Sequence, residues 1–125
     1  MKITVETTNA PAAIGPYSQA IVANGLIYTS GQIPVNPLTG EIESETIEGQ
    51  TRQVIENLSS LLEAAGSGLD RVIKTTCFLK NINDFASFNK VYAGFFSEKP
   101  ARSCVEVSAL PKGALVEIEV IAEVQ

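Results

Sequence analysis

The chain begins with three short, largely apolar segments, at residues 2–6, 18–23 and 25–30, separated by turn-forming residues. The third segment, within GLIYTSGQIP, is rich in residues that favour strands and is stopped by Gly31 and Pro34. The NPLTGE stretch that follows is typical of a turn. The first third of the sequence therefore predicts three short strands.

Further along the chain, the apolar residues follow the spacing of a helix. Between residues 45 and 65 apolar residues recur every three or four positions, which predicts a long amphipathic helix. Gly66 and Gly68 are expected to end it. A second helix is expected after Asn83 or Asp84, either of which can cap it. The apolar positions are Ile47, Val54, Leu58, Leu61, Leu62 and Ala65 in the first helix, and Phe85, Phe88, Tyr92 and Phe95 in the second.

Three more strands are expected in the second half of the chain. DRVIKTTCFLK, at about residues 70–80, is rich in β-branched residues. Pro100 separates the second helix from the strand ARSCVEV, and LVEIEVIAEV ends the chain after the turn ALPKGA. The order β-β-β-α-β-α-β-β predicts one α+β domain over residues 1–125, with both helices covering one face of the sheet.

Alternation sorts the strand residues by face, because successive side chains of a strand point to opposite sides of a sheet. The apolar positions of the last strand are expected to meet the helices, so Glu117 points to the uncovered face. By the same rule, we expect Val105 on the helix side and Arg102 on the uncovered face, next to Glu117. The helix side holds Ile73, Cys77, Leu79, Val105, Val107, Val116, Ile118, Val120, Ala122 and Val124, and the uncovered face holds Lys74, Thr76, Phe78, Arg102, Cys104, Glu106, Glu117, Glu119 and Glu123.

The expected uncovered face is mixed in character. Phe78, Leu115 and Ile121 lie there among the charged residues. A monomer would leave these apolar groups in water, so the pattern predicts contact with other subunits on this face.

Composition and charge narrow the choice of function. The 125 residues carry a net charge of −5 without any run of Lys or Arg, so nucleic-acid binding is not expected. The absence of His removes Ser-His-Asp and Cys-His catalysis and the commonest transition-metal ligand, so no metal site is expected. Neither a membrane span nor the apolar core of a signal peptide is present. Two cysteines without CxxC spacing favour a cytoplasmic protein with free thiols.

Five positions carry candidate chemistry. Arg102 could clamp a carboxylate through two parallel hydrogen bonds or form an inter-subunit salt bridge, and the pattern favours neither. Cys104 is a candidate nucleophile beside a cation, but without His no group takes its proton, so a filler role is favoured. Glu117 is a candidate base, although an interface carboxylate is the simpler interpretation. The Gly31 N–H could bind an anion, and Tyr17 could supply a ligand hydroxyl or only pack.

Four stretches taken together resemble one protein family: APAAIGPYSQA, YTSGQIPVNPLTGE, NDFASFNKVY and PARSCVEVSALPKGALVEIEVIA. Over about residues 9–123, in the same order, they are similar to the reactive intermediate deaminase A (RidA) family, also called YjgF or L-PSP proteins. The resemblance implies a chorismate-mutase-like α+β fold with a mixed sheet, and a homotrimer with sites in clefts between subunits. It also implies cofactor-independent hydrolysis of 2-iminobutanoate and 2-iminopropanoate, or their enamine tautomers, to 2-oxo acids and ammonia. Pyridoxal-phosphate enzymes release these species from threonine, serine or cysteine.

The resemblance also assigns roles to single residues. Arg102 matches the arginine that grips the substrate carboxylate, and Gly31 matches a backbone donor to the same group. Glu117 matches the acid that orients or activates water, and Cys104 matches a pocket-lining cysteine. The other pocket positions are Tyr17, Ser30 and Asn89.

Two functions of other classes compete with the deaminase. One is a regulatory module that binds small 2-oxo acids without turnover, as some relatives do. The other is a ribonuclease or translation inhibitor, a role attributed to some relatives. The acidic charge balance and the absence of His argue against the second.

Overall fold

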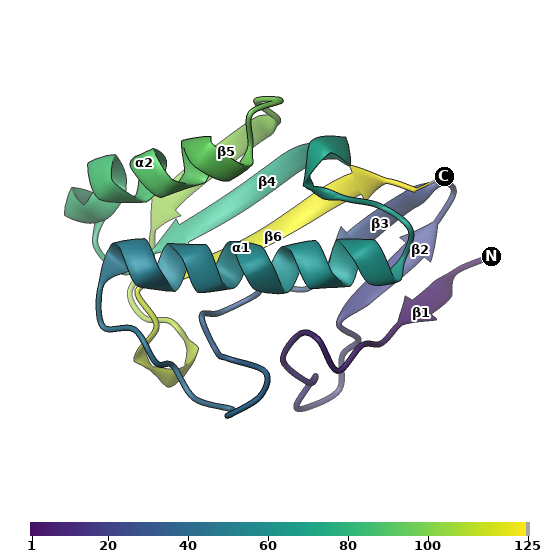
Figure 1. Ribbon diagram of the computed structural model, residues 1–125, viewed down its shortest axis with the longest axis horizontal. Coiled ribbons are helices and arrows are strands. Elements are labelled where there is room, and N and C mark those ends of the chain that lie inside the picture. Colours follow the sequence, from purple (N-terminus) through teal and green to yellow (C-terminus); the bar gives the residue numbers. More distant parts are fainter. Residues whose placement is uncertain (125) are drawn as a thin grey trace.

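A six-stranded sheet forms one layer and two α-helices form the other in the computed structural model, which describes residues 1–124 (Figure 1). The strand order is β1-β2-β3-β6-β4-β5; β4 and β5 are parallel, and all other neighbours are antiparallel. The expected element order, mixed sheet and α+β layering are confirmed. The elements are β1 (Ile3–Val5), β2 (Ala20–Ala23), β3 (Leu26–Thr29), α1 (Ile47–Ala64), η1 (Leu69–Arg71), β4 (Val72–Leu79), η2 (Ile82–Asp84), α2 (Phe85–Phe95), β5 (Ala101–Glu106), η3 (Pro111–Gly113) and β6 (Val116–Glu123).

Both ends of α1 are capped by residues that suit the task. The Thr46 hydroxyl accepts a hydrogen bond from the Gly49 N–H at 3.0 Å, which satisfies one free donor of the first turn. At the other end Gly66 adopts φ +78°, and the N–H of Ser67 donates to the Leu62 carbonyl at 2.8 Å. This is the Schellman arrangement, which satisfies the last carbonyls and explains why the helix ends where the sequence predicts.

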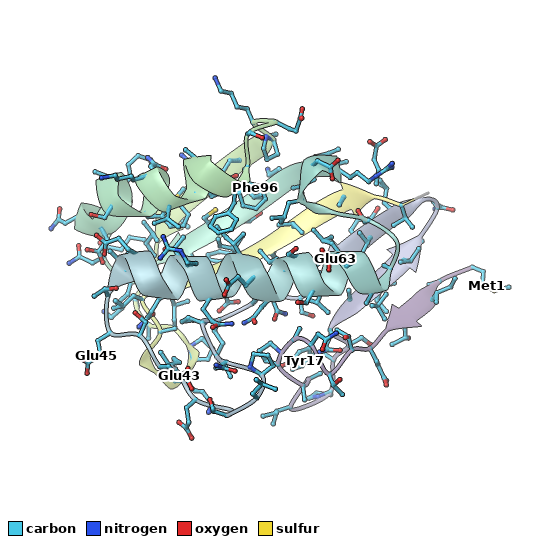
Figure 2. All side chains as sticks on the ribbon, in the orientation of Figure 1. Met1, Tyr17, Glu43, Glu45, Glu63 and Phe96 are labelled. Carbon is cyan, nitrogen blue, oxygen red and sulfur yellow. The ribbon has the colours of Figure 1, made fainter. Side chains whose placement is uncertain are left out.

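The core lies between the sheet and the two helices. β6 is central, and its residues Val116, Ile118, Val120 and Ala122 are at most 2% exposed, as the alternation predicts. Phe88, Tyr92 and Phe96 contribute the aromatic part of the core, and Figure 2 shows Phe96 between α1 and α2. Within residues 1–124, neither helix is long and apolar enough to cross a membrane.

The face assignment expected for β5 is wrong. The parallel register places Arg102 beside Thr75 and Cys104 beside Cys77 on β4. Thr75 and Cys77 are completely buried, so Arg102 and Cys104 lie on the helix side, whereas Val105 is 46% exposed. Alternation separates the two faces of β5 correctly. The more hydrophobic face, which carries Val105, was expected to meet the helices, but in this edge strand the face that carries Arg102 packs against α2.

Two more face assignments differ from expectation. Ile73 is 43% exposed, because a β-bulge between Val72 and Lys74 shifts the phase of β4 against β6. Glu106 also lies on the helix side, where its carboxylate accepts a hydrogen bond from the Ile82 N–H at 2.8 Å. Glu106 therefore accepts a hydrogen bond from a free backbone N–H at the first residue of η2.

The sheet face opposite the helices is not covered by any part of the described chain. Tyr28 pairs with Ile121 across β3 and β6, and Phe78 pairs with Val105 across β4 and β5. Glu117 lies beside Phe78 on the same face. The mixed apolar and acidic character expected for this face is confirmed for Phe78, Ile121 and Glu117, whereas Leu115, also expected here, packs against the core.

Truncating the centre of β6 tests the core assignment. Ile118→Ala removes a completely buried side chain and should lower the free energy of unfolding by about 2–5 kcal/mol. Ile82→Ala is the matched control, because Ile82 is 44% exposed, and it should cost less than about 1 kcal/mol. Urea unfolding followed by circular dichroism at one protein concentration measures both. Equal losses would contradict the assignment of β6 as the central buried strand.

Candidate functional site

Arg102 projects from β5 toward α2 and lies against three aromatic rings. Its guanidinium carbon is 4.9 Å from the ring centre of Tyr92, 5.4 Å from that of Phe85 and 6.0 Å from that of Phe88. The three residues are spaced three and four apart, so they lie on one face of α2. A cation is attracted to the negative face of an aromatic ring. The apolar stripe of this helix therefore also forms the wall against which Arg102 is held.

The Arg102 guanidinium has one hydrogen-bond partner among residues 1–124. Its Nη1 donates to Oδ1 of Asn89 at 2.7 Å. Arginine has five N–H donors, and neither a ring nor an amide neutralises its charge, so most of its capacity to bind an anion is left. We call Phe85, Phe88, Asn89, Tyr92 and Arg102 the Arg102 cluster. A groove of about 350 Å³ opens beside it, lined by Asn89, Tyr92, Ala93, Phe96, Ser97, Lys99, Pro100 and Arg102.

Cys104 lies two residues along β5 from Arg102 and borders the core. Burial raises the pKa of the Cys104 thiol, and the nearby Arg102 charge offsets only part of that rise. Its strand neighbour Cys77 is more deeply buried, and burial raises the pKa of that thiol to about 12. Because burial raises both pKa values, both thiols are protonated near neutral pH. A protonated thiol is a poor nucleophile, since the thiolate is the reactive form. These directions agree with the filler role expected for Cys104.

Glu117 lies on the uncovered face of β6, and Gly31 lies directly against its carboxylate. A Cβ atom on Gly31 would overlap a carboxylate oxygen and lie 2.8 Å from the Cδ of Glu117. Two hydrogen bonds fix this approach: the Gln32 N–H donates to the Ile118 carbonyl at 2.8 Å, and the Ile118 N–H donates to the Gln32 carbonyl at 3.1 Å. A side chain at position 31 would therefore push the Glu117 carboxyl group out of its present position, with no positive φ involved.

The protonation of Glu117 is shifted by its surroundings. Burial raises the pKa of its carboxyl, and the Glu119 carboxylate on the same face of β6 raises that pKa further. A carboxylate with a raised pKa accepts a proton more readily, which suits a general base.

Ser30 and Tyr17 belong to two neighbouring loops beside Gly31. The Ser30 hydroxyl donates to the Ser18 carbonyl at 2.6 Å, which ties the loop after β3 to the loop that carries Tyr17. Tyr17 is 52% exposed, and Figure 2 shows it on the side of α1 away from α2. We call Tyr17, Ser30, Gly31 and Glu117 the Glu117 cluster.

Gln19 supports this cluster and was not identified from the sequence. It is 4% exposed, and its amide accepts from the Thr7 N–H and contacts the carbonyls of Thr7, Ala10 and Pro11 at 2.8 to 3.3 Å. These contacts hold the N-terminal segment against the Tyr17 loop, where a groove of about 730 Å³ opens. A polar residue directly before the apolar run AIVA is the sequence signal that could have revealed it.

The two clusters do not meet within one chain. Arg102 lies on the helix side of β5, and Glu117 lies on the uncovered face of β6, with β4 between the two strands. The register sets Arg102 level with Val120, three residues from Glu117, which adds roughly 10 Å along the strand. The expectation that Arg102 and Glu117 share a face is therefore wrong. The structure groups Asn89, Arg102 and Cys104 on one side, and Ser30, Gly31 and Glu117, with the Tyr17 loop, on the other.

Neither cluster has the donors of a metal site. Over residues 1–124, no group of three or more His, Cys, Asp or Glu side chains is arranged to hold a metal ion. Each cluster instead contains one group that can act on an anion or a proton. The Arg102 cluster offers a cation, and the Glu117 cluster offers a carboxylate.

Comparison with known proteins gives similar sequences over the whole chain. It is 60% identical over 126 residues to "Putative regulator AldR" of Lactococcus lactis subsp. lactis (strain IL1403), covering 100% of this chain and 99% of that protein. It is 51% identical over 126 residues to a 2-iminobutanoate/2-iminopropanoate deaminase of Escherichia coli (strain K12), covering 98% of each. The crystal structure of E. coli TdcF with bound serine matches with a TM-score of 0.93 and 45% identity, covering 98% of this chain and 99% of that one.

A family model also spans both clusters. The model described as Endoribonuclease L-PSP matches residues 7–124, which include Tyr17 and Glu117 at the two ends of the site. Full-length relatives at this level of identity support the same grouping. The chain therefore belongs to the L-PSP family, the RidA-like family that its sequence resembles.

Proposed function

We propose that the protein is a 2-iminobutanoate/2-iminopropanoate deaminase, which hydrolyses these imines and their enamine tautomers to 2-oxo acids and ammonia. The observation that carries the proposal is the Arg102 guanidinium, which is held by rings and an amide and keeps its charge for a ligand. A planar guanidinium matches a carboxylate through two parallel hydrogen bonds. A relative of 51% identity carries the name of this activity, and the relative TdcF has bound serine, a small molecule with a carboxylate.

We further propose that the working form is a homotrimer with sites between subunits. In one chain Arg102 and Glu117 lie on opposite faces of the sheet, so one site can combine them only if two chains contribute. The Arg102 cluster of one subunit would then face Gly31 and Glu117 of the partner subunit. The uncovered apolar face around Tyr28 and Val105 supplies surface for such contacts.

Hydrolysis in this site needs three events. Arg102 binds the substrate carboxylate, assisted by the Gly31 N–H of the partner subunit, and this contact holds the C2 carbon in place. The Glu117 carboxylate of the partner subunit takes a proton from water as the water oxygen bonds to C2 of the protonated imine. That proton then passes to nitrogen, and as the C–N bond breaks the Glu117 carboxylate takes the proton of the new hydroxyl group, so ammonia leaves and the 2-oxo acid remains. An enamine first gains a proton at C3 to become the imine.

The remaining pocket residues play supporting parts. A protonated imine is already electrophilic, so no covalent nucleophile is required, and the neutral Cys104 thiol is a wall of the pocket. No cofactor enters the proposed reaction. Since both cysteines are free thiols, we place the activity in the cytoplasm.

A regulatory function is the second candidate, because a relative of 60% identity is called a putative regulator. In that case Arg102 would bind 2-oxo acids, but no imine would be hydrolysed. The family description as an endoribonuclease offers a third function. A net charge of −5 and the absence of His argue against RNA cleavage.

The oligomeric state is the first test. Light scattering after size exclusion should give three times the 13.3 kDa chain mass, about 40 kDa. A stable monomer at micromolar concentration would contradict both the trimer and the shared site.

Substitution of Arg102 and Glu117 should separate binding from turnover. Arg102→Ala removes the clamp and should abolish 2-oxobutanoate binding and activity, because a charge-assisted bond is worth about 1.5–3 kcal/mol and two are lost. Glu117→Gln keeps the shape but removes the base, so it should spare binding and lower the rate by about 10²–10⁴-fold. Calorimetric titration and 2-oxo acid release, coupled to a threonine dehydratase, measure the two effects.

Mixing these variants tests whether two chains share each site. Arg102→Ala and Glu117→Gln chains, co-expressed in equal amounts, should regain activity, because ~25% of sites in random trimers combine both native residues. Each variant alone is the control. No recovery in verified mixed trimers would place both residues in sites built from one chain and reject the shared site.

The pH dependence tests the role of Glu117 independently. Burial is the larger cause of the raised pKa of Glu117, and the Glu119 carboxylate raises that pKa further. Glu119→Gln removes that like charge, so the pKa of Glu117 should fall and the base should stay ionised at lower pH. The acidic limb of kcat/KM should therefore move to lower pH, measured with excess dehydratase at each pH. An acidic limb that persists in the residual activity of a trimeric Glu117→Gln variant would show that another group supplies the base.

A further inference from the structure

Tyr92 connects the Arg102 cluster to the buried part of the sheet. Its hydroxyl lies 2.7 Å from the Thr75 hydroxyl in a buried hydrogen bond. Thr75 is completely buried on β4, and the parallel register makes it the direct neighbour of Arg102 on β5. One side chain therefore contacts both strands, with its hydroxyl on β4 and its ring 4.9 Å from the cation on β5.

We infer that Tyr92 is a positioning residue for the carboxylate clamp. The bond to Thr75 sets how deeply the Tyr92 ring reaches toward the sheet, and the ring sets where the Arg102 guanidinium rests. Asn89 fixes the same group from a second direction through Nη1. The inference rests on the proposed function, because it assigns Tyr92 a part in binding the 2-oxo acid or imine carboxylate through Arg102.

A neutral wall suits an arginine that must bind a carboxylate. An Asp or Glu partner would hold the guanidinium but compete with the ligand for it. Ring faces attract a cation without cancelling its charge. The titratable groups packed beneath it are also neutral, because burial raises the pKa of the Tyr92 phenol and of the Cys77 and Cys104 thiols. Lys99, which lines the same groove, is basic and does not compete with a carboxylate ligand.

Of the three rings, Tyr92 lies nearest the guanidinium, and its hydroxyl is held by a hydrogen bond. Phe85 is 37% exposed, and Phe88 is farther from the guanidinium, at 6.0 Å. Neither can form a hydrogen bond through its side chain. The Tyr92 ring lies between those of Phe88 and Phe96, with centre-to-centre distances of 5.5 and 4.5 Å. Packing on both flanks and the bond at its tip leave this ring little freedom to move.

The test compares three variants of α2 in the assembled protein. Tyr92→Leu removes the ring face and should weaken 2-oxobutanoate binding by about 10- to 30-fold, whereas Tyr92→Phe, which keeps the ring, should weaken it only ~2- to 4-fold. Val91→Ala is the control, since Val91 is a buried neighbour that lines neither groove. It should lower Tm and leave Kd unchanged. In the coupled assay, Tyr92→Leu should raise KM by a similar factor and change kcat by less than about 3-fold.

The outcomes separate this inference from the proposed function. If the wild type binds 2-oxobutanoate and Arg102→Ala does not, the clamp stands. Wild-type affinity in Tyr92→Leu would then overturn only the positioning role. If the wild type shows no binding, or Arg102→Ala binds normally, the clamp and the positioning role are both rejected.

A second set of variants decides the matter if Tyr92→Leu does not fold. Thr75→Val leaves the buried Tyr92 hydroxyl without its partner, and Tyr92→Phe leaves the Thr75 hydroxyl with only the Cys77 thiol, so each should lower Tm. The double variant removes both hydroxyls and should regain much of the lost stability. The positioning role predicts that its affinity for 2-oxobutanoate stays weakened while Tm recovers. Recovery of both Tm and Kd would show that the hydroxyl pair serves stability alone.

Discussion

The parallel pairing of β4 with β5 is the constraint on which the site depends. Because side chains alternate along a strand, the pairing of Thr75 with Arg102 allows only one face for the guanidinium. A slip of one residue would turn Arg102 to the uncovered face and place Val105 under α2. Hydrophobicity alone would favour that slip. The rings and the amide of α2 favour the observed register, because they give the aliphatic stem and the cation of Arg102 suitable partners.

That register has a consequence for assembly. With Arg102 under α2 and Glu117 on the opposite face, the proposed carboxylate clamp and the proposed base of a single chain cannot act on one small molecule. A 2-imino acid has its carboxylate bonded directly to the reacting carbon, so the two groups must come within a few ångströms of each other. Assembly of identical chains through the uncovered face offers a way to meet this requirement, which links the fold directly to the proposed chemistry.

The two clusters also manage charge in opposite ways. Within residues 1–124, Arg102 is held by ring faces and one amide oxygen, none of which carries a negative charge. Around Glu117, burial and the Glu119 carboxylate disfavour the ionised form, and Gly31 packs so closely that a side chain would collide with the carboxyl group. The proposed reaction would use both groups, Arg102 to hold the carboxylate and Glu117 to accept a proton, and an uncatalysed addition of water to an imine has neither.

The sequence by itself determined the element order, both helices with their apolar faces, and the buried side of β6, because each follows from spacing along one segment. Motifs and resemblance also singled out the pocket candidates Tyr17, Ser30, Gly31, Asn89, Arg102, Cys104 and Glu117, which stay predictions, whereas the parts of Gln19 and Tyr92 appear only in the structure. Tertiary structure decided which face of β5 carries Arg102, where the bulge at Ile73 shifts the phase of β4, and how closely Gly31 approaches Glu117. These features depend on which strand pairs with which and in what register, a choice that no single segment contains.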